Sequence, residues 1–414
     1  MRRSAVSEND NKNASRSEAL PIFANVFEDD ESPKRRQLAG DQPKEKQKRS
    51  WFWIGLFMAI VTMSLSISVP VSIYLLRGTA FTSRRSSSST RLAALIRSRL
   101  PSVSFDNPTS PESRALVWMI EVDTYEQDTL SDDQFVQRFA MTAMGLSING
   151  LESWLTGSPE CSWGSFQVSC NQSGRISRIV AGWNLLTGSI PVSIGLLTSM
   201  EKVALYHNNG LNGTIPSEVG GLTLLTQLSL GSNNLTGMIP TEIGGLTSLN
   251  DLSLYDNALT GTVPSEVGGL GALKELRLYS NRLNGTIPSE FGGLTSLTCL
   301  HLYSNTLTNT IPSEFGGLAS LNELTLNINR LTGTIPSEVG SLTVLSWLDF
   351  GRNDFTGSIP VEMGGLTALR WMHLNNNTLT GTVPSSVCQV VTPQIDCDEI
   401  VCECCRDSSQ QQCP

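Results

Sequence analysis

Three equally spaced tyrosines are the residues of this sequence whose chemistry is easiest to state. Tyr255, Tyr279 and Tyr303 follow one another at intervals of 24 residues. If each lies on one strand of a sheet, neighbouring rings are about 4.8 Å apart and form an exposed ladder on the order of 10 Å long. Such rings either pack on one another and stiffen the sheet or offer a rigid amphipathic platform to a peptide or sugar. The sequence leaves both interpretations open.

Charged and aromatic residues recur at neighbouring positions of the same segments. Because alternate residues of a strand face the same side, these positions share one surface with the tyrosines. The predicted ligand-binding residues are Tyr206, Tyr255, Tyr279, Tyr303, Arg277, His301, Asp251, Glu275, Trp347 and Trp371, with Glu323 beside them. The three histidines of the chain, His207, His301 and His373, lie several repeats apart on this surface, which favours solvated side chains over a pH-responsive cluster.

The sequence predicts no catalytic residues, no metal site and no cofactor. Cys299 and His301 are two residues apart, roughly 6.6 Å along a strand, whereas a nucleophile and its base need contact at about 3 Å. A glutamate also recurs in every repeat, but a cation site needs several oxygens that converge on one point. We therefore expect a solvated acidic edge. Its members are Glu218, Glu242, Glu266, Glu290, Glu314, Glu338 and Glu362. A phosphate-binding glycine loop and a nucleophile elbow are absent from the sequence.

Eight of the nine cysteines lie on either side of the repeats, which is typical of disulfide-bonded caps in an oxidising compartment. The predicted disulfide cysteines are Cys161, Cys170, Cys388, Cys397, Cys402, Cys404, Cys405 and Cys413. The six in the tail allow 15 pairings, and the alternative to disulfides is a zinc site in a reducing compartment. Sequons, which suit the same oxidising compartment, occur at Asn171, Asn212, Asn234, Asn284 and Asn376.

A 24-residue repeat organises the second half of the chain. Prolines recur at Pro191, Pro216, Pro240, Pro264, Pro288, Pro312, Pro336, Pro360 and Pro384, with one interval of 25 and seven of 24. The alternation around residue 277 predicts a short strand with Leu276 and Leu278 inward and Arg277 and Tyr279 outward, so successive repeats add parallel strands to one sheet. One unit cannot bury its own leucines, and nine stacked units form a solenoid with a continuous core.

Each repeat also has an asparagine at the bend after its strand. These residues are Asn184, Asn208, Asn233, Asn257, Asn281, Asn305, Asn329, Asn353 and Asn377. Their amides can satisfy backbone groups that the turn leaves unpaired, which predicts a structural role.

The repeat unit L-x-x-L-x-L-x-x-N-x-L-T-G-T-I-P, clearest in residues 273–296, resembles the plant-type leucine-rich repeats of plant receptor ectodomains and polygalacturonase-inhibiting proteins. The resemblance covers residues 174–390. It implies an α/β solenoid, a right-handed superhelix with a parallel concave sheet, and ligand binding on the concave face.

Both ends of the repeat array are predicted to be capped. Residues 113–123 and 131–155 have helical apolar spacing, and Ser131 is a suitable helix N-cap. A helical stretch, a Trp and a Cys pair before the first repeat look like the plant-type N-terminal cap, which implies a bond between Cys161 and Cys170. The cysteine-rich tail departs from the usual plant C-terminal cap.

The 27 residues from Ser50 to Leu76 carry no charge, which predicts one membrane-spanning helix rather than a cleaved signal peptide. Seven basic residues before it and four after it favour a cytoplasmic N-terminus, as in membrane proteins with these repeats in algae. The prediction is a single-pass plasma-membrane protein with an extracellular repeat domain.

The predicted domains follow from these features. They are a disordered cytoplasmic tail at 1–50, a transmembrane helix at 51–76, a flexible Ser-rich stalk at 77–110, a helical N-terminal cap at 111–173, nine repeats at 174–387 and a Cys-rich cap at 388–414. Residues 111–414 carry 12 basic and 28 acidic groups, and an acidic surface repels nucleic acid.

The sequence predicts a membrane-anchored extracellular recognition protein, a receptor or co-receptor without a kinase, because fifty residues are too few for one. Its expected partners are a protein, peptide or glycan ligand, the membrane through residues 51–76, and a signalling co-receptor. The alternatives are an adhesion or cell-wall structural protein and, by resemblance, an inhibitor of an extracellular hydrolase. An enzyme is the class that the sequence favours least.

Overall fold

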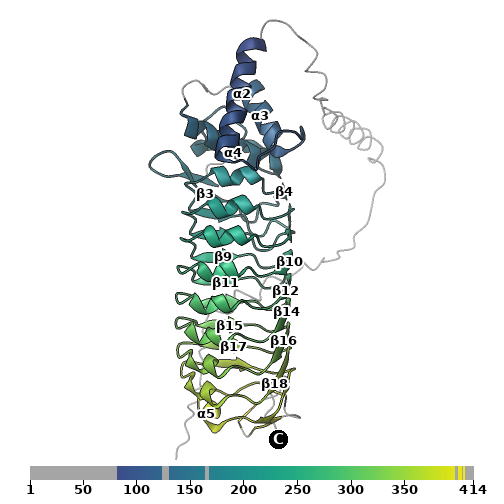
Figure 1. Cartoon of the computed structure of the whole chain (residues 1–414), viewed down its shortest axis with the longest axis vertical. Coiled ribbons are helices and arrows are strands. Elements are labelled where there is room, and N and C mark those ends of the chain that lie inside the picture. The colour runs from purple at the N-terminus through teal and green to yellow at the C-terminus, as the bar shows by residue number, and fades with distance from the viewer. Residues whose placement is uncertain (1–81, 124–129, 164–166, 397–399, 403, 406–414) are drawn as a thin grey trace, which may run out of the picture. The chain divides into compact units, whose positions relative to one another are not determined.

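The computed structural model describes residues 82–123, 130–163, 167–396, 400–402 and 404–405. They belong to one compact unit, residues 75–414, in which the repeats stack one on the next beneath three N-terminal helices (Figure 1). The predicted tail at 1–50 and the predicted membrane segment at 51–76 lie outside the described residues.

The predicted location as a single-pass plasma-membrane protein is corrected by the helices of the structure. Among the described residues, no helix has both the length and the apolar composition needed to cross a membrane. The longest of them, α2 (Thr82–Arg99), has 18 residues and is rich in serine and arginine.

The predicted parallel sheet is present as a sheet of ten strands. In chain order these are β2 (Val168–Cys170), β3 (Ile176–Val180), β5 (Lys202–Ala204), β7 (Gln227–Ser229), β9 (Asp251–Ser253), β11 (Glu275–Arg277), β13 (Cys299–His301), β15 (Glu323–Thr325), β17 (Trp347–Asp349) and β19 (Trp371–His373). All neighbours from β3 onward are parallel, and β2 runs antiparallel to β3. Equivalent residues of neighbouring repeats stand opposite one another, as Arg277 does to His301. The solvent-facing side of this sheet is called the concave face below.

A second set of strands lies across each coil from the ten-stranded sheet. Seven form one sheet: β8 (Thr236–Gly237), β10 (Ala258–Thr262), β12 (Arg282–Gly285), β14 (Thr306–Asn309), β16 (Arg330–Gly333), β18 (Asp354–Gly357) and β20 (Thr378–Leu379). Three more pair as β1 (Ile148–Asn149), β4 (Thr187–Ser189) and β6 (Gly210–Asn212). Here the register is 22 residues, with Thr260 opposite Arg282. This outer sheet was not predicted, because its Thr-Gly-Thr segments have the composition of a turn.

Short 3-10 helices connect the outer strands to the next inner strand. They are η5 (Val192–Leu196), η6 (Ser217–Gly221), η7 (Thr241–Gly245), η8 (Ser265–Gly269), η9 (Ser289–Gly293), η10 (Ser313–Gly317), η11 (Ser337–Ser341) and η12 (Val361–Gly365). Proline precedes each of them with a φ near −65°, which suits the start of a helix. Two further 3-10 helices, η3 (Glu152–Trp154) and η4 (Glu160–Ser162), lie in the N-terminal cap.

The core is one continuous stack of aliphatic side chains. Leu276 and Leu278 are fully buried, while Arg277 and Tyr279 are partly exposed, so the predicted alternation is confirmed. Burying one such leucine contributes about 1.5–3 kcal/mol. Because each layer repeats the same leucines, the stability of one coil depends on the coils on either side.

The predicted role of the asparagine column is confirmed by its hydrogen bonds. The Asn305 side-chain Nδ2 donates to the carbonyl oxygens of Leu278 and Leu302 at 3.0 and 3.1 Å, and its Oδ1 accepts from Leu283 N at 3.1 Å. Asn305 is 8% exposed. One amide therefore satisfies backbone groups of two neighbouring coils that water does not reach.

The N-terminal cap is helical, as predicted. Helix α3 (Pro111–Glu121) packs on α4 (Asp132–Ser147), and Ser131 caps α4 through a reciprocal bond with Gln134. The predicted Cys161–Cys170 disulfide is present. Buried Arg138 holds the cap together, because it donates to the carboxylates of Asp123 and Glu160 at 2.5 and 2.8 Å.

Residues 82–110 differ from the flexible stalk that was expected. They contain helix α2 and a turn, and Leu92, Ile96 and Leu100 are buried in the core cluster that includes α3 and α4. The spacing of four residues places these three side chains on one face of the helix. The serine-rich half of α2 obscured this short apolar stripe in the sequence.

The C-terminal cap closes the repeat array with helix α5 (Ser385–Cys388) and the strand pair β21 (Gly381–Thr382) and β22 (Ile400–Val401). Disulfides join Cys388 to Cys404 and Cys402 to Cys405, which favours disulfides over the zinc alternative for these four. Cys397 and Cys413 lie outside the described residues.

Candidate ligand-binding surface

The three equally spaced tyrosines form a stack on the concave face. The ring centroids of Tyr255 and Tyr279 are 4.8 Å apart with planes 10° from parallel, and those of Tyr279 and Tyr303 are 4.4 Å apart with planes 9° from parallel. Each tyrosine is partly exposed. The faces of the Tyr279 ring are therefore both covered by neighbours, and the ladder presents ring edges and hydroxyls to solvent.

Glycine at the matching position of the preceding repeat makes room for this stack. A Cβ atom on Gly231 would lie 2.5 Å from the Tyr255 ring, so the ring lies directly over the glycine backbone. Burial raises the pKa of the Tyr255 and Tyr279 phenols, and it raises the pKa of the Tyr303 phenol to about 12. All three hydroxyls are thus neutral at physiological pH and can both donate and accept hydrogen bonds.

Aromatic residues continue from the tyrosine stack toward the N-terminal cap. The His207 ring stacks on Trp183 with centroids 3.9 Å apart, and His207 Nε2 lies 3.4 Å from the Tyr255 hydroxyl. Tyr206 contacts the same histidine edge to face. Trp183 is 62% exposed, so it extends the surface although the sequence gave no reason to select it.

A charged group lies beside the stack, one position earlier on the strands. Arg277 Nη1 donates to Glu275 Oε2 at 2.5 Å and lies 3.9 Å from Asp251 Oδ1. Asp251 also accepts from Ser253 and Gln227 at 2.6 and 3.0 Å. Burial nevertheless raises the pKa of the Asp251 carboxyl. Two carboxylates thus share one guanidinium, which leaves this part of the surface acidic.

The next repeats bring together a cysteine, a histidine and a glutamate. His301 Nε2 lies 3.3 Å from Cys299 Sγ and 3.1 Å from Glu323 Oε2. The expectation that Cys299 and His301 are too far apart for contact is therefore wrong. It used the separation of the backbone along the strand, whereas the two side chains bend toward each other. The hydrogen bond from His301 lowers the pKa of Glu323, and burial raises the pKa of the Cys299 thiol to about 12.

Two tryptophans occupy the C-terminal end of the same column. Trp347 and Trp371 have ring centroids 5.5 Å apart, and Trp371 is 51% exposed. His373 lies against Trp347 and its Nδ1 is 3.6 Å from Asp349 Oδ2. The ten residues predicted to bind ligand thus lie on one face, although they fall into separate tyrosine, charged and tryptophan groups along it.

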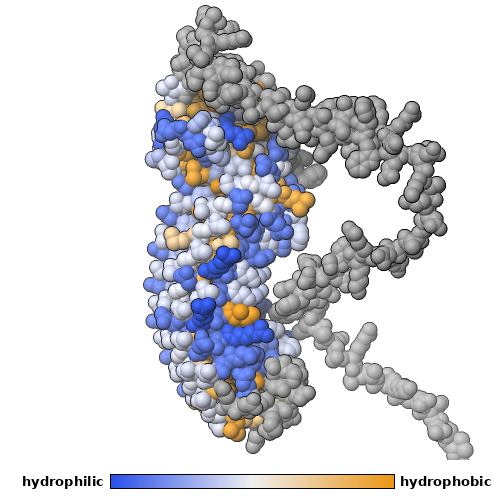
Figure 2. Space-filling model, turned by 90° about the vertical axis from the view of Figure 1, so that its right-hand side faces the viewer, coloured by the Kyte–Doolittle hydropathy of each residue, from blue (hydrophilic) through white to orange (hydrophobic). Residues whose placement is uncertain are grey.

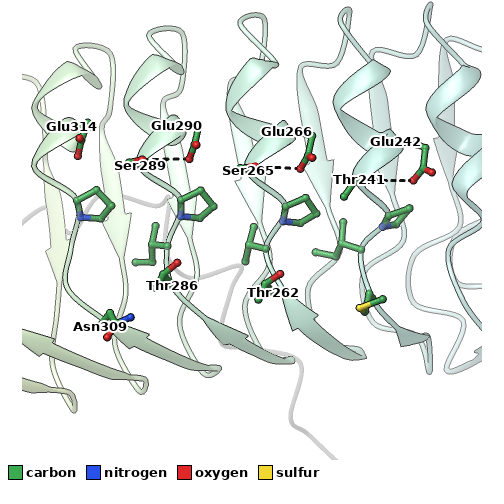
Figure 3. A pocket seen from close by; sticks show the side chains of 18 of the residues that line it. Thr241, Glu242, Thr262, Ser265, Glu266, Thr286, Ser289, Glu290, Asn309 and Glu314 are labelled. Atoms are coloured by element: carbon green, nitrogen blue, oxygen red, sulfur yellow. Dashed lines mark hydrogen bonds between the residues drawn. The ribbon is translucent and has the colours of Figure 1, made fainter.

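The repeated glutamates line an open groove of about 1540 Å³ on a different part of each coil. Figure 3 shows Glu242, Glu266 and Glu290 side by side, each on its own 3-10 helix. Each accepts a hydrogen bond from the hydroxyl residue before it, as Glu266 does from Ser265 at 3.4 Å. Because the carboxylates repeat in parallel and do not converge, the prediction of an acidic edge without a cation site agrees with this geometry.

The sequons lie at accessible positions. The asparagines Asn171, Asn212, Asn234, Asn284 and Asn376 are all exposed. On the side of the molecule seen in Figure 2, hydrophobic residues form small separate spots. The aromatic groups of the concave face are therefore a more specific candidate for ligand binding than that side.

Sequence comparisons match leucine-rich repeat families. The model described as Leucine rich repeat matches residues 271–331, and the model described as Leucine Rich Repeat matches residues 224–246 and 368–390. Receptor-like kinase TMK2 of Arabidopsis thaliana is 36% identical over 81 residues, which are 20% of this chain and 9% of that protein. Polygalacturonase inhibitor 1 of Oryza sativa subsp. japonica is 30% identical over 87 residues, which are 20% of this chain and 26% of that protein. The chain thus spans about a quarter or less of these relatives.

Two solved structures are similar in fold. One is the leucine-rich repeat ectodomain of the plant membrane receptor kinase GASSHO1/SCHENGEN3 from Arabidopsis thaliana in complex with CASPARIAN STRIP INTEGRITY FACTOR 2, at 33% identity and TM-score 0.54, covering 60% of this chain and 33% of that one. The other is a plant ice-binding protein, at 28% identity and TM-score 0.50, covering 61% of this chain and 88% of that one. With its 24-residue coils, parallel sheet and asparagine column, the chain belongs to the plant-type leucine-rich repeat ectodomain family.

Proposed function

We propose that the protein recognises an extended peptide or protein segment on its concave face and acts by binding, not by catalysis. The observation that supports this most is the in-register stack of Tyr255, Tyr279 and Tyr303 beside the acidic group of Asp251 and Glu275. Rigid aromatic side chains bury contact area at low entropic cost, which makes them effective binding residues. The similar receptor ectodomain in complex with a partner protein supports recognition by this fold.

The covered ring faces favour a peptide over a sugar. A sugar stacks on a free aromatic face, but Tyr255 and Tyr303 cover both faces of Tyr279. The exposed ring edges and neutral hydroxyls suit the donors and acceptors of a peptide backbone. Disulfides at both ends of the array suit an oxidising compartment, where such a ligand would be met.

The first outward column of the sheet suggests the polarity of this ligand. It runs from Arg178 and Lys202 near the N-terminal cap, through the acidic group, to Trp347 and Trp371. Complementary charge fixes the orientation of a bound chain. The proposed ligand therefore has an acidic end toward Lys202, a basic residue at the acidic group and an apolar end at the tryptophans.

Selection from a displayed random-peptide library on the immobilised protein tests this function. Enriched peptides are expected to follow that order of charges and to lose at least about 10-fold in affinity to Tyr279→Ala, since buried aromatic contacts are worth about 2 kcal/mol or more at interfaces. Thr262→Ala on the outer sheet is the matched control and is expected to bind normally. Equal affinity for both variants would place the ligand elsewhere.

A second candidate function rests on the outer sheet. Threonines repeat there in two mostly exposed columns at the strand spacing of about 4.8 Å. The columns are Thr236, Thr260, Asn284, Thr308, Thr332, Thr356 and Thr380, and Thr214, Met238, Thr262, Thr286, Thr310, Thr334, Ser358 and Thr382. The Thr260 and Thr308 hydroxyls donate to glycine carbonyls of the preceding coil, both at 3.3 Å, which fixes their rotamers. Such a regular array favours binding to a lattice of ordered water, in line with the similarity to an ice-binding protein.

Inhibition of ice growth by the purified protein tests this second function. Thr286→Lys is expected to abolish the inhibition because a long charged side chain interrupts the flat array, whereas Tyr279→Ala is expected to leave it unchanged. Ice growth that is equal with and without the protein would exclude the outer sheet from this role. A glycan at Asn284, which lies in the same array, is expected to have the effect of the lysine.

A further inference from the structure

We propose that Cys299, His301 and Glu323 form a binding site for a divalent zinc ion on the concave face. The proposal goes beyond peptide recognition and does not depend on it. The ligand atoms would be Cys299 Sγ, His301 Nε2 and Glu323 Oε2, and these three atoms all lie within 4.8 Å of one another. Thiolate, imidazole and carboxylate are the three side-chain groups that bind zinc in proteins.

The distances between these atoms fit a tetrahedral ion. Zinc lies about 2.3 Å from sulfur and about 2.0 Å from nitrogen or oxygen, so its ligand atoms are about 3.3–3.6 Å from one another. The sulfur to nitrogen distance is 3.3 Å and the nitrogen to oxygen distance is 3.1 Å. An ion at their centre requires only small side-chain movements. Three protein ligands leave a fourth position open to water or to a donor atom of a bound molecule.

The contacts at His301 favour a metal site over a catalytic triad. In a Cys-His-Glu triad the nucleophile contacts one ring nitrogen of the histidine and the carboxylate contacts the other. Here Cys299 and Glu323 both approach Nε2. Two ligand atoms that meet at one nitrogen match the arrangement around a shared ion, with the metal in place of the proton on Nε2.

The scaffold of the site is rigid and its surroundings are acidic. Cys299 and His301 lie on β13, and Glu323 stands directly opposite Cys299 on β15. The nearby guanidinium of Arg277 is held by Glu275 and Asp251, so its charge is already matched by two carboxylates. Sites on regular strands hold their ligands more precisely than loops do. Cys299 is 7% exposed and is the free cysteine among the described residues.

Titration of the chelator-washed full chain with Co²⁺, followed by competition with Zn²⁺, tests the site. We expect one equivalent of Co²⁺ to give a sulfur-to-cobalt charge-transfer absorption that Zn²⁺ abolishes. Cys299→Ser is expected to lose this absorption, and Glu323→Gln is expected to bind at least about 10-fold more weakly. His373→Asn removes a histidine paired with Asp349 on the same face and is the matched control.

The proposal is overturned if Co²⁺ gives no such absorption or if Cys299→Ser retains it. Retention would assign the metal to the other sulfur cluster, formed by Cys388, Cys402 and Cys404. Protection of the wild-type thiol provides a readout that needs no variant. Zn²⁺ is expected to slow alkylation at Cys299, measured by peptide mass spectrometry, and an unchanged rate would contradict the site.

Discussion

The rings of Tyr279 and Tyr303 lie 4.4 Å apart and 9° from parallel on neighbouring strands of the concave face. The 24-residue register places their backbones opposite one another, and Tyr255 extends the stack by one strand. The same contacts stiffen the sheet and determine which parts of the rings meet a ligand. The two interpretations of the tyrosines, mutual packing and a binding platform, are therefore compatible.

Removal of the central ring is expected to lower stability. Tyr279→Ala loses two aromatic contacts of about 0.5–1.5 kcal/mol each, so the free energy of unfolding should fall by about 1–3 kcal/mol. Tyr279→Phe keeps both ring contacts and should lie within about 0.5 kcal/mol of the wild type. Urea unfolding followed by circular dichroism measures both. A similar loss in both variants would mean that the hydroxyl, not the stacking, stabilises the sheet.

Loss of one asparagine amide should cost more. Asn305→Ala leaves buried carbonyls of Leu278 and Leu302 without their donor, at about 1–3 kcal/mol for each unsatisfied group. Asn309→Gly in the same repeat is the control. Asn309 has a φ of 65°, and glycine occupies this position with φ near 75° in most repeats, so we expect no loss there. Equal unfolding midpoints for the two variants in urea would refute the structural role of the asparagine column.

The two glycines of each Gly-Gly pair should differ sharply in tolerance. A Cβ atom on Gly268 would lie 2.5 Å from Glu290 Cβ and 2.6 Å from its carbonyl oxygen, whereas a Cβ atom on Gly269 has nothing within 4 Å. Gly268→Ala is therefore expected to destabilise by about 1–3 kcal/mol through overpacking, and Gly269→Ala to be neutral. Thermal unfolding distinguishes them, and a reversed order would contradict the packing of successive 3-10 helices.

The contact between His301 and Glu323 should make stability depend on acidity. This hydrogen bond lowers the pKa of Glu323 in the folded protein below its usual value of 4.5. The stabilisation is therefore fully present above the unfolded pKa and is lost as pH falls through the folded pKa. The difference in unfolding free energy between wild type and Glu323→Gln should shrink below about pH 4.5. A difference that grows with acidity would contradict the assigned shift.

The repeated features could be predicted from the sequence because each is specified by residue type and spacing. Leu276 and Leu278 face the core, Asn305 bonds the backbone of two coils and Ser131 caps a helix, all as predicted. Side-chain rotamers and contacts between distant segments could not be predicted. Cys299 and His301 meet through their rotamers, and Arg138 pairs with Asp123 and Glu160 through the fold of the cap.

A photoreactive phenylalanine derivative in place of Tyr279 tests ligand binding on the concave face most directly. A peptide selected on the wild-type protein should form a covalent adduct with this variant on irradiation, with the crosslink located by mass spectrometry. The same derivative at Thr262, on the outer sheet, should give no adduct with that peptide. An adduct from position 262 and none from position 279 would show that the ligand binds on the opposite side of the coils and would contradict the proposed function.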